Sequence, residues 1–139
     1  MRSLSRQCLV IAGLALLGCG DETPFSPTLE TVAGSYQATS LTATENGITA
    51  DLLLVGASLT VVLNENGTTT GRLVAPGLGE NGADVDEDLA GTWTLAGSTV
   101  TFDQAGDTFI RDVPFTAERD RLSAEGTFDG VIVRAVLTK

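Results

Sequence analysis

The chain has 139 residues, 42% of them hydrophobic, which is enough for one folded domain with a core. It contains no histidine, so the commonest general base and the commonest metal ligand are both missing. Its formal net charge of −10 opposes binding to phosphate backbones, and we therefore expect no nucleic-acid partner.

The first eighteen residues have the layout of an export leader. Arg2 and Arg6 precede an apolar run from Cys8 to Leu17. The run is too short to cross ~30 Å of hydrocarbon as a helix. A positive segment followed by such a run is typical of a secretory signal peptide, and we assign residues 1–18 to one.

The stretch "LLGC" at positions 16–19 resembles the lipobox of bacterial lipoproteins. The resemblance implies that the thiol of Cys19 receives a diacylglyceryl group and that cleavage follows Gly18. It also implies a lipid-anchored, extracytoplasmic protein of the bacterial cell envelope. Gly20 follows the cysteine, which by analogy favours the outer membrane where a cell has two. The alternative is an ordinary signal peptide that happens to contain a cysteine.

The residues after Cys19 are polar and contain prolines at positions 24 and 27. Proline favours extended backbone and discourages helix. We therefore expect residues 19–32 to form the lipidated cysteine and a flexible tether, and residues 33–139 to form the folded domain.

From residue 33 onward, hydrophobic side chains recur at every second position, which predicts strands. Turn signals such as "NENG" at 64–67 and Asp129-Gly130 separate them. The pattern predicts strands over 34–44, 57–63, 68–75, 90–95, 98–103, 107–116, 121–128 and 130–138. The longer connection at 45–56 is expected to hold a short helical or extended cover, and the acidic connection at 76–88 is expected to be a mobile loop.

Eight strands joined mostly by tight turns predict an all-β, antiparallel, up-and-down arrangement. Such a ribbon closes into a barrel or splits into a β-sandwich. Sequential hairpins favour the barrel, because a sandwich usually needs crossing connections. Closure would also leave the apolar last strand without a free edge.

The stretches "GSYQATS", "SLTVVLNENGT" and "GTWTLAGSTVTF" are similar to the small lipocalin-like domain of many bacterial lipoproteins. The resemblance implies an eight-stranded barrel that binds a small apolar or amphiphilic ligand. It further implies that an arginine on the last strand packs across the aromatic ring of the first. We therefore expect the Arg134 guanidinium to lie against Tyr36 where the barrel closes.

Aromatic side chains are spread over the predicted strands and could line a ligand pocket. The candidate lining residues are Tyr36, Trp93, Phe102, Phe109 and Arg111. The same aromatic residues could instead fill the lumen, because an eight-stranded barrel is only just wide enough for side chains or one small ligand. Arg111 shares parity with Phe109. If that face is internal, its guanidinium points into the lumen and needs a carboxylate, either the protein's own or a ligand's. The alternative is a bulge near Pro114 that returns Arg111 to solvent.

With no histidine and no cysteine in the folded part, a Ser-His or Cys-His pair cannot be built. We expect no catalytic site, no cofactor and no dedicated metal centre. The "DVDED" stretch at 84–88 starts like a calcium loop but lacks its later glycine and glutamate, which leaves only irregular calcium binding by this loop.

Two functions therefore remain. The first is a lipoprotein, anchored to the membrane through Cys19, whose barrel carries a small hydrophobic ligand. The alternative is a protein-interaction or inhibitor module with a filled barrel core that acts through acidic loops such as 76–88.

Overall fold

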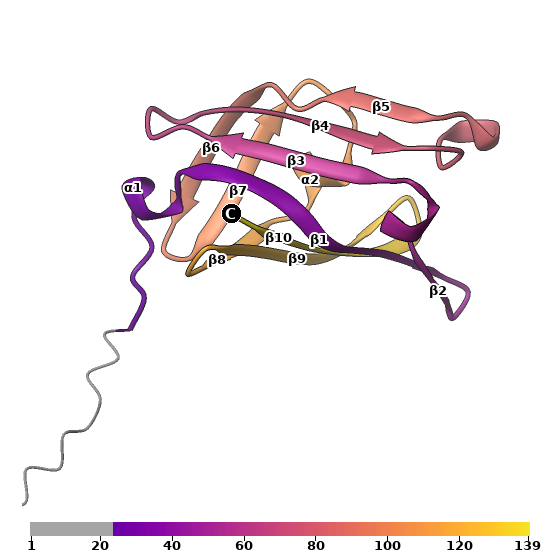
Figure 1. The fold of residues 1–139 in the computed structure, drawn as a ribbon, viewed down its shortest axis with the longest axis horizontal. Coiled ribbons are helices and arrows are strands. Elements are labelled where there is room, and N and C mark those ends of the chain that lie inside the picture. The colour runs from indigo at the N-terminus through magenta and orange to yellow at the C-terminus, as the bar shows by residue number, and fades with distance from the viewer. Residues whose placement is uncertain (1–23) are drawn as a thin grey trace, which may run out of the picture.

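In the computed structural model, which describes residues 24–139, ten strands form one antiparallel sheet that curls round on itself (Figure 1). The elements in chain order are α1 (Leu29–Val32), β1 (Gly34–Glu45), β2 (Ile48–Asp51), the 3-10 helix η1 (Leu53–Val55), β3 (Ser58–Leu63), β4 (Thr68–Ala75), the 3-10 helix η2 (Glu80–Gly82), β5 (Val85–Asp88), β6 (Gly91–Ala96), β7 (Thr99–Gln104), α2 (Phe109–Asp112), β8 (Phe115–Glu118), β9 (Arg121–Phe128) and β10 (Val131–Thr138). The predicted leader and Cys19 lie outside the described residues.

The first and last strands of the sheet pair with each other and close a barrel. β1 and β10 are antiparallel from Gln37 opposite Thr138 to Thr44 opposite Ile132, with a bulge between Ala38 and Ser40. Eight strands make the closed wall, and β2 and β5 are additional. The prediction of an antiparallel barrel rather than a sandwich is thus confirmed.

The two additional strands extend the sheet at one end of the barrel. β4 pairs with β6 near its start and with β5 near its end, so that Ala75 lies opposite Val85. The expectation that all of 76–88 is a mobile loop is therefore wrong for Val85–Asp88, which pairs with β4 along its backbone. Within 45–56, β1 and β2 form a hairpin that leads into η1.

The predicted strand over 107–116 is replaced by the helix α2 and the short strand β8. β7 and β8 pair only at Thr99 opposite Thr116 and Val100 opposite Phe115, so the two strands diverge beyond this point. α2 packs against β7 and β9, on either side of this gap. The consecutive residues Phe109 and Ile110 are both buried, which a strand with alternating faces does not allow.

The folded part of the chain begins before residue 33. The α1 helix lies within the predicted tether, and its Val32 side chain is buried in the core. Thr28 caps the helix: its hydroxyl accepts a hydrogen bond from the Thr31 amide at 3.2 Å.

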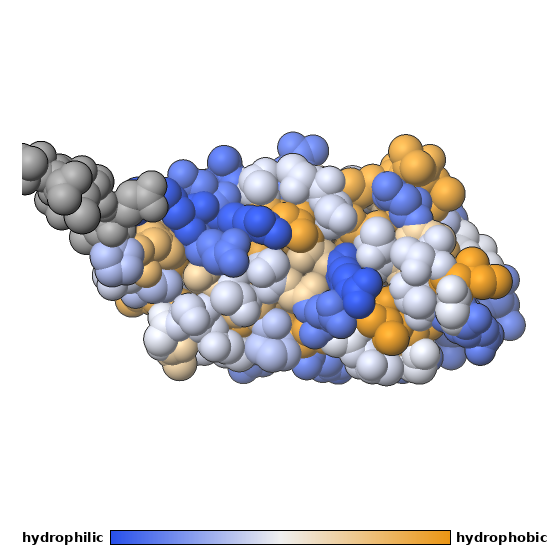
Figure 2. Space-filling model, turned by 90° about the horizontal axis from the view of Figure 1, so that it is seen from below, coloured by the Kyte–Doolittle hydropathy of each residue, from blue (hydrophilic) through white to orange (hydrophobic). Residues whose placement is uncertain are grey.

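The barrel has two different ends, which we name by their elements. The N-terminal end carries α1, the turns at 64–67, 97–98 and 119–120, and Lys139; the far end carries β2, η1 and the connections at 76–84, 105–108 and 129–130 (Figure 1). Figure 2 shows hydrophobic surface gathering toward the end of the molecule away from α1. Among residues 24–139, the exposed large hydrophobic side chains other than Leu29 all belong to the far end: Ile48, Leu54, Val55, Leu78 and Ile132.

Candidate functional site

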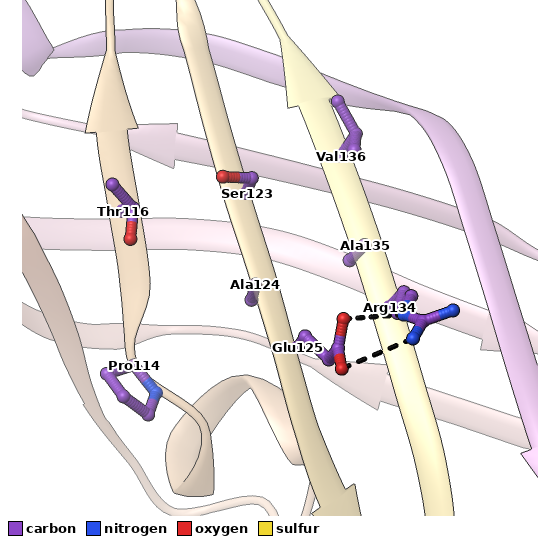
Figure 3. Close-up of a pocket in the computed structure, with 8 residues that line it drawn as sticks. All are labelled: Pro114, Thr116, Ser123, Ala124, Glu125, Arg134, Ala135 and Val136. Atoms are coloured by element: carbon purple, nitrogen blue, oxygen red, sulfur yellow. Dashed lines mark hydrogen bonds and ion pairs between the residues drawn. The ribbon is translucent and has the colours of Figure 1, made fainter.

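A hollow of about 530 Å³ lies on the outer face of β8, β9 and β10 (Figure 3). Its lining residues are Pro114, Thr116, Ser123, Ala124, Glu125, Arg134, Ala135 and Val136. Small side chains on these strands leave the space, and the hollow is open to solvent. It lies outside the barrel, so it is not the lumen that the sequence led us to consider.

The charged groups of this hollow neutralise each other. Arg134 donates from Nε to Glu125 Oε2 at 2.5 Å and from a terminal nitrogen to Oε1 at 3.3 Å. These hydrogen bonds lower the pKa of Glu125 below its usual value. Both side chains are 58% exposed, so the pair contributes little to stability and leaves no free charge to recruit a ligand.

The predicted contact between Arg134 and Tyr36 is wrong. Arg134 lies opposite Thr42 in the β1–β10 ladder, well along the strand from Tyr36. Because its neighbours Val133 and Ala135 are buried, alternation directs Arg134 outward.

Lys139 occupies the position that we expected for Arg134. Its ammonium nitrogen lies 5.5 Å from the Tyr36 ring centroid and donates to the carbonyl oxygens of Thr31 at 2.7 Å and Ala33 at 3.0 Å. A cation on the end of the last strand thus ties α1 to the first strand. The signal in the sequence was barrel closure itself, which places the last residues beside residues 34–37.

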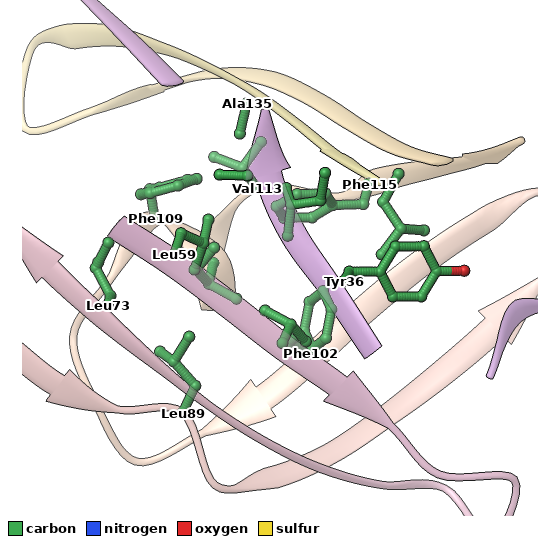
Figure 4. Close-up of a cluster of buried hydrophobic side chains, with 14 of the residues drawn as sticks. Tyr36, Leu59, Leu73, Leu89, Phe102, Phe109, Val113, Phe115 and Ala135 are labelled. Atoms are coloured by element: carbon green, nitrogen blue, oxygen red, sulfur yellow. The ribbon is translucent and has the colours of Figure 1, made fainter. Parts of the chain in front are cut away.

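The barrel interior is filled by side chains from all eight wall strands (Figure 4). Four of the five predicted lining residues, Tyr36, Trp93, Phe102 and Phe109, belong to this single buried cluster. Phe102 packs edge-on against Phe115, with ring centroids 5.5 Å apart and planes at 86°. The structure therefore brings the predicted aromatic residues together as a core.

The polar atoms of the buried aromatic residues already have protein partners. The Tyr36 hydroxyl donates to the Val32 carbonyl oxygen at 2.6 Å, and Trp93 Nε1 donates to the Asn64 carbonyl oxygen at 2.8 Å. Each residue is only 2% exposed. A ligand at these side chains would have to replace existing contacts rather than fill free space.

Arg111 does not point into the lumen. It lies on α2, where it donates to Asp107 at 2.5 Å and to Asp112 at 2.8 Å, and its side chain is 34% exposed. The strand parity that directed it inward does not apply to a helix, whose first two residues, Phe109 and Ile110, are the buried ones. Arg111 is exposed because it lies on the helix α2, and not because of a bulge near Pro114.

Two buried polar atoms beside α2 have no hydrogen-bond partner among the described residues, the Gln104 side-chain oxygen and the Thr108 hydroxyl. The Gln104 amide nitrogen does donate to the Leu89 carbonyl oxygen at 3.0 Å, which fixes the orientation of the side chain.

The acidic connection between β4 and β6 is ordered by its own carboxylates. Arg72 on β4 donates two hydrogen bonds, of 2.7 and 2.6 Å, to the carboxylate of Asp86 on β5. These hydrogen bonds lower the pKa of Asp86. Asp84 accepts from the Gly77 amide at 2.8 Å. Within residues 24–139, no group of three or more acidic, cysteine or histidine side chains is placed to hold a metal ion.

The single tyrosine of the chain offers a direct check on this packing. Burial, with the nearby Asp120 charge adding to it, raises the pKa of Tyr36 to about 12. Because the folded state holds the proton more tightly than the unfolded state, its extra stability is present below pH ~10 and is lost as the pH rises toward 12. Absorbance at 295 nm should therefore show tyrosinate near pH 12 in folded protein and near pH 10 in urea; equal midpoints would contradict this burial.

These features define the class as a closed, eight-stranded antiparallel β-barrel with two additional strands, an architecture consistent with lipocalin-like barrels. No family model, curated protein or solved structure shows a significant match to the chain. In the part that the structure describes, no helix is long and apolar enough to cross a membrane.

Proposed function

We propose that this protein is a lipid-anchored, extracytoplasmic lipoprotein whose barrel serves as a protein-interaction module. The anchor rests on the resemblance of residues 16–19 to a lipobox. The interaction role rests on the filled barrel, since the side chains expected to line a ligand pocket pack against one another. With the interior occupied, the outer surface is what remains for recognition.

The charge of the molecule supports a protein partner. Every basic side chain between residues 24 and 139 is engaged by a carboxylate or, for Arg119, by the Phe25 ring at 5.7 Å. Many carboxylates remain without a counter-ion in this part of the chain. A surface with unpaired negative charge attracts basic partners and speeds their capture at low salt.

The competing function is transport of a small apolar or amphiphilic molecule in the lumen. For that, side chains such as Phe115 and Phe109 would have to move aside, at the cost of their burial. A carrier prepared from a bacterial envelope should still hold such a molecule, whereas a filled barrel should not.

Native mass spectrometry of soluble protein starting at Gly20 separates the two functions. We expect one species at the mass of the chain alone, both for protein secreted into the periplasm and after incubation with a mixture of fatty acids and phospholipids. A co-purified or retained lipid, lost on unfolding in acid, would overturn the interaction proposal in favour of the carrier.

A further inference from the structure

The far end of the barrel combines exposed hydrophobic side chains with unpaired negative charge. We call its exposed hydrophobic residues the apolar rim: Ile48, Leu54, Val55, Leu78 and Ile132. They come from four separate segments, namely β2, η1, the β4–β5 connection and β10. Leu54 is 84% exposed and Ile48 75%. Side chains of this kind add nothing to the core, yet four segments present them at one end.

The η1 segment is held firmly while it presents two rim residues to solvent. The buried Leu52 donates its amide to the Leu41 carbonyl oxygen at 2.8 Å and accepts from the Ala57 amide at 3.0 Å. Asp51 accepts from the Leu53 amide at 3.0 Å. Because both sides of η1 are fastened, Leu54 and Val55 project from a fixed turn, and docking against them orders little additional backbone.

Five carboxylates lie on the segments that carry the rim residues or directly next to them. Glu45 lies opposite Ile48 in the β1–β2 hairpin, and Asp129 lies in the turn before β10. Asp51, Glu80 and Asp84 belong to the segments that carry the other rim residues, and none of these five has an ion pair among residues 24–139.

The opposite end of the barrel is different in charge. Arg119, Arg121 and Lys139 all lie there, beside α1, from which the chain continues toward Cys19. Four carboxylates lie at that end as well, namely Glu30, Glu65, Glu118 and Asp120, so its charges nearly balance. The five carboxylates near the rim, in contrast, have no ion pair among residues 24–139.

This distribution decides which partner fits the rim. An anionic membrane surface would be repelled by the nearby carboxylates. A second copy of the chain docked rim to rim would bring two acidic ends together, which like-charge repulsion opposes. A segment with apolar side chains flanked by lysine or arginine satisfies both features at once.

We propose that the apolar rim is the docking site for a basic, amphipathic segment of a partner protein. The inference rests on the proposed interaction function and names its surface and the chemistry of its partner. Apolar side chains of the segment cover Leu54, Val55 and Ile48, and its basic residues pair with the nearby carboxylates.

The test uses soluble protein starting at Gly20 and three probes: an 18-residue peptide of leucine and lysine with its leucines on one helix face, the same peptide with glutamate in place of lysine, and vesicles of phosphatidylglycerol and phosphatidylethanolamine. Binding is followed by anisotropy of labelled peptide and by backbone NMR shifts. We expect the lysine peptide alone to bind, with shifts at η1, β2 and the 76–84 connection.

Two variants should weaken this binding about tenfold or more: Leu54→Ser with Val55→Ser, and Glu45→Gln with Glu80→Gln. The second should also flatten the salt dependence. Matched controls come from the other end, Leu29→Ser for an exposed leucine and Glu65→Gln for an exposed carboxylate, and should bind as the unaltered protein does. All six positions are exposed, so folding should be unaffected.

Several results would overturn the proposal: no binding of the lysine peptide, equal binding of the glutamate peptide, shifts confined to another surface, capture by vesicles, or a dimer in solution that the rim variants abolish. Failure of the interaction proposal is a separate result, because it appears as lipid retained in the native mass spectrum. If the lysine peptide binds to another surface, the rim is not the docking site, but the proposed interaction function is unaffected.

Discussion

The Gly91→Ala variant is expected to lose about 3 kcal/mol of its free energy of unfolding, near the upper end for an overpacked site. Gly91 begins β6 and lies opposite Gln104 in β7. An added methyl group would overlap the Asp103 carbonyl oxygen and lie 3.1 Å from Gln104 Cγ. The obstacle is backbone of the neighbouring wall strand, which cannot move without breaking ladder hydrogen bonds.

Gly106→Ala is the matched control for this prediction. Its added methyl group would meet Glu87 Oε2 at 3.4 Å, an ordinary contact with the far end of a side chain. Urea unfolding followed by fluorescence of Trp93, the single tryptophan of the chain, measures both variants. Equal stability of the two would show that β6 and β7 do not approach as closely as described.

The barrel could be predicted from the sequence because its signals are local and repeated. The "NENG" turn forms as expected, with the Asn64 amide donating to Thr68 and the Gly67 amide donating to Asn64. Asp129 and Gly130 both have positive φ, at 50° and 80°, the pair of conformations that an Asp-Gly hairpin turn requires. Turns of this kind fix antiparallel neighbours in chain order, and closure follows once the apolar faces are buried on one side.

The α2 helix could not be predicted from alternation. It is a single turn of four residues, too short for a helical period to show. Phe109, Arg111, Val113 and Phe115 alternate with other residues as a strand would, so the pattern imitates β structure. The helix forms because β7 and β8 separate, and that gap is a property of the closed barrel rather than of the segment.

The choice between Arg134 and Lys139 depended on register, which is also non-local. Barrel closure predicts that the last strand lies beside the first, but it does not predict which residues face each other. The bulge between Ala38 and Ser40 shifts the ladder, and the antiparallel order then places the end of β10, not its middle, beside Tyr36. A cation does lie over the Tyr36 ring, as predicted, but it is Lys139, five residues after the predicted Arg134.

The lipid anchor leads to the largest expected change in the behaviour of the protein. Cys19→Ser should abolish fatty-acid attachment and release the barrel from the membrane, because a serine hydroxyl does not form the thioether that the anchor requires. Two or three acyl chains, at ~0.8 kcal/mol for each buried methylene, hold a protein on a membrane durably, whereas the remaining polar tether has no such affinity. Metabolic labelling with an alkyne fatty acid in a bacterial host, followed by membrane fractionation, measures both effects.

The chain supplies its own control, since Cys8 is its other cysteine and lies within the apolar run. Cys8→Ser should retain the label and the membrane association, because only the thiol that follows "LLG" occupies the lipobox position. Label that persists in Cys19→Ser and disappears in Cys8→Ser would move the anchor to Cys8. If the unaltered protein carries no label but is exported, residues 1–18 are an ordinary leader. The barrel would then diffuse freely and meet its partner in solution rather than at a membrane surface.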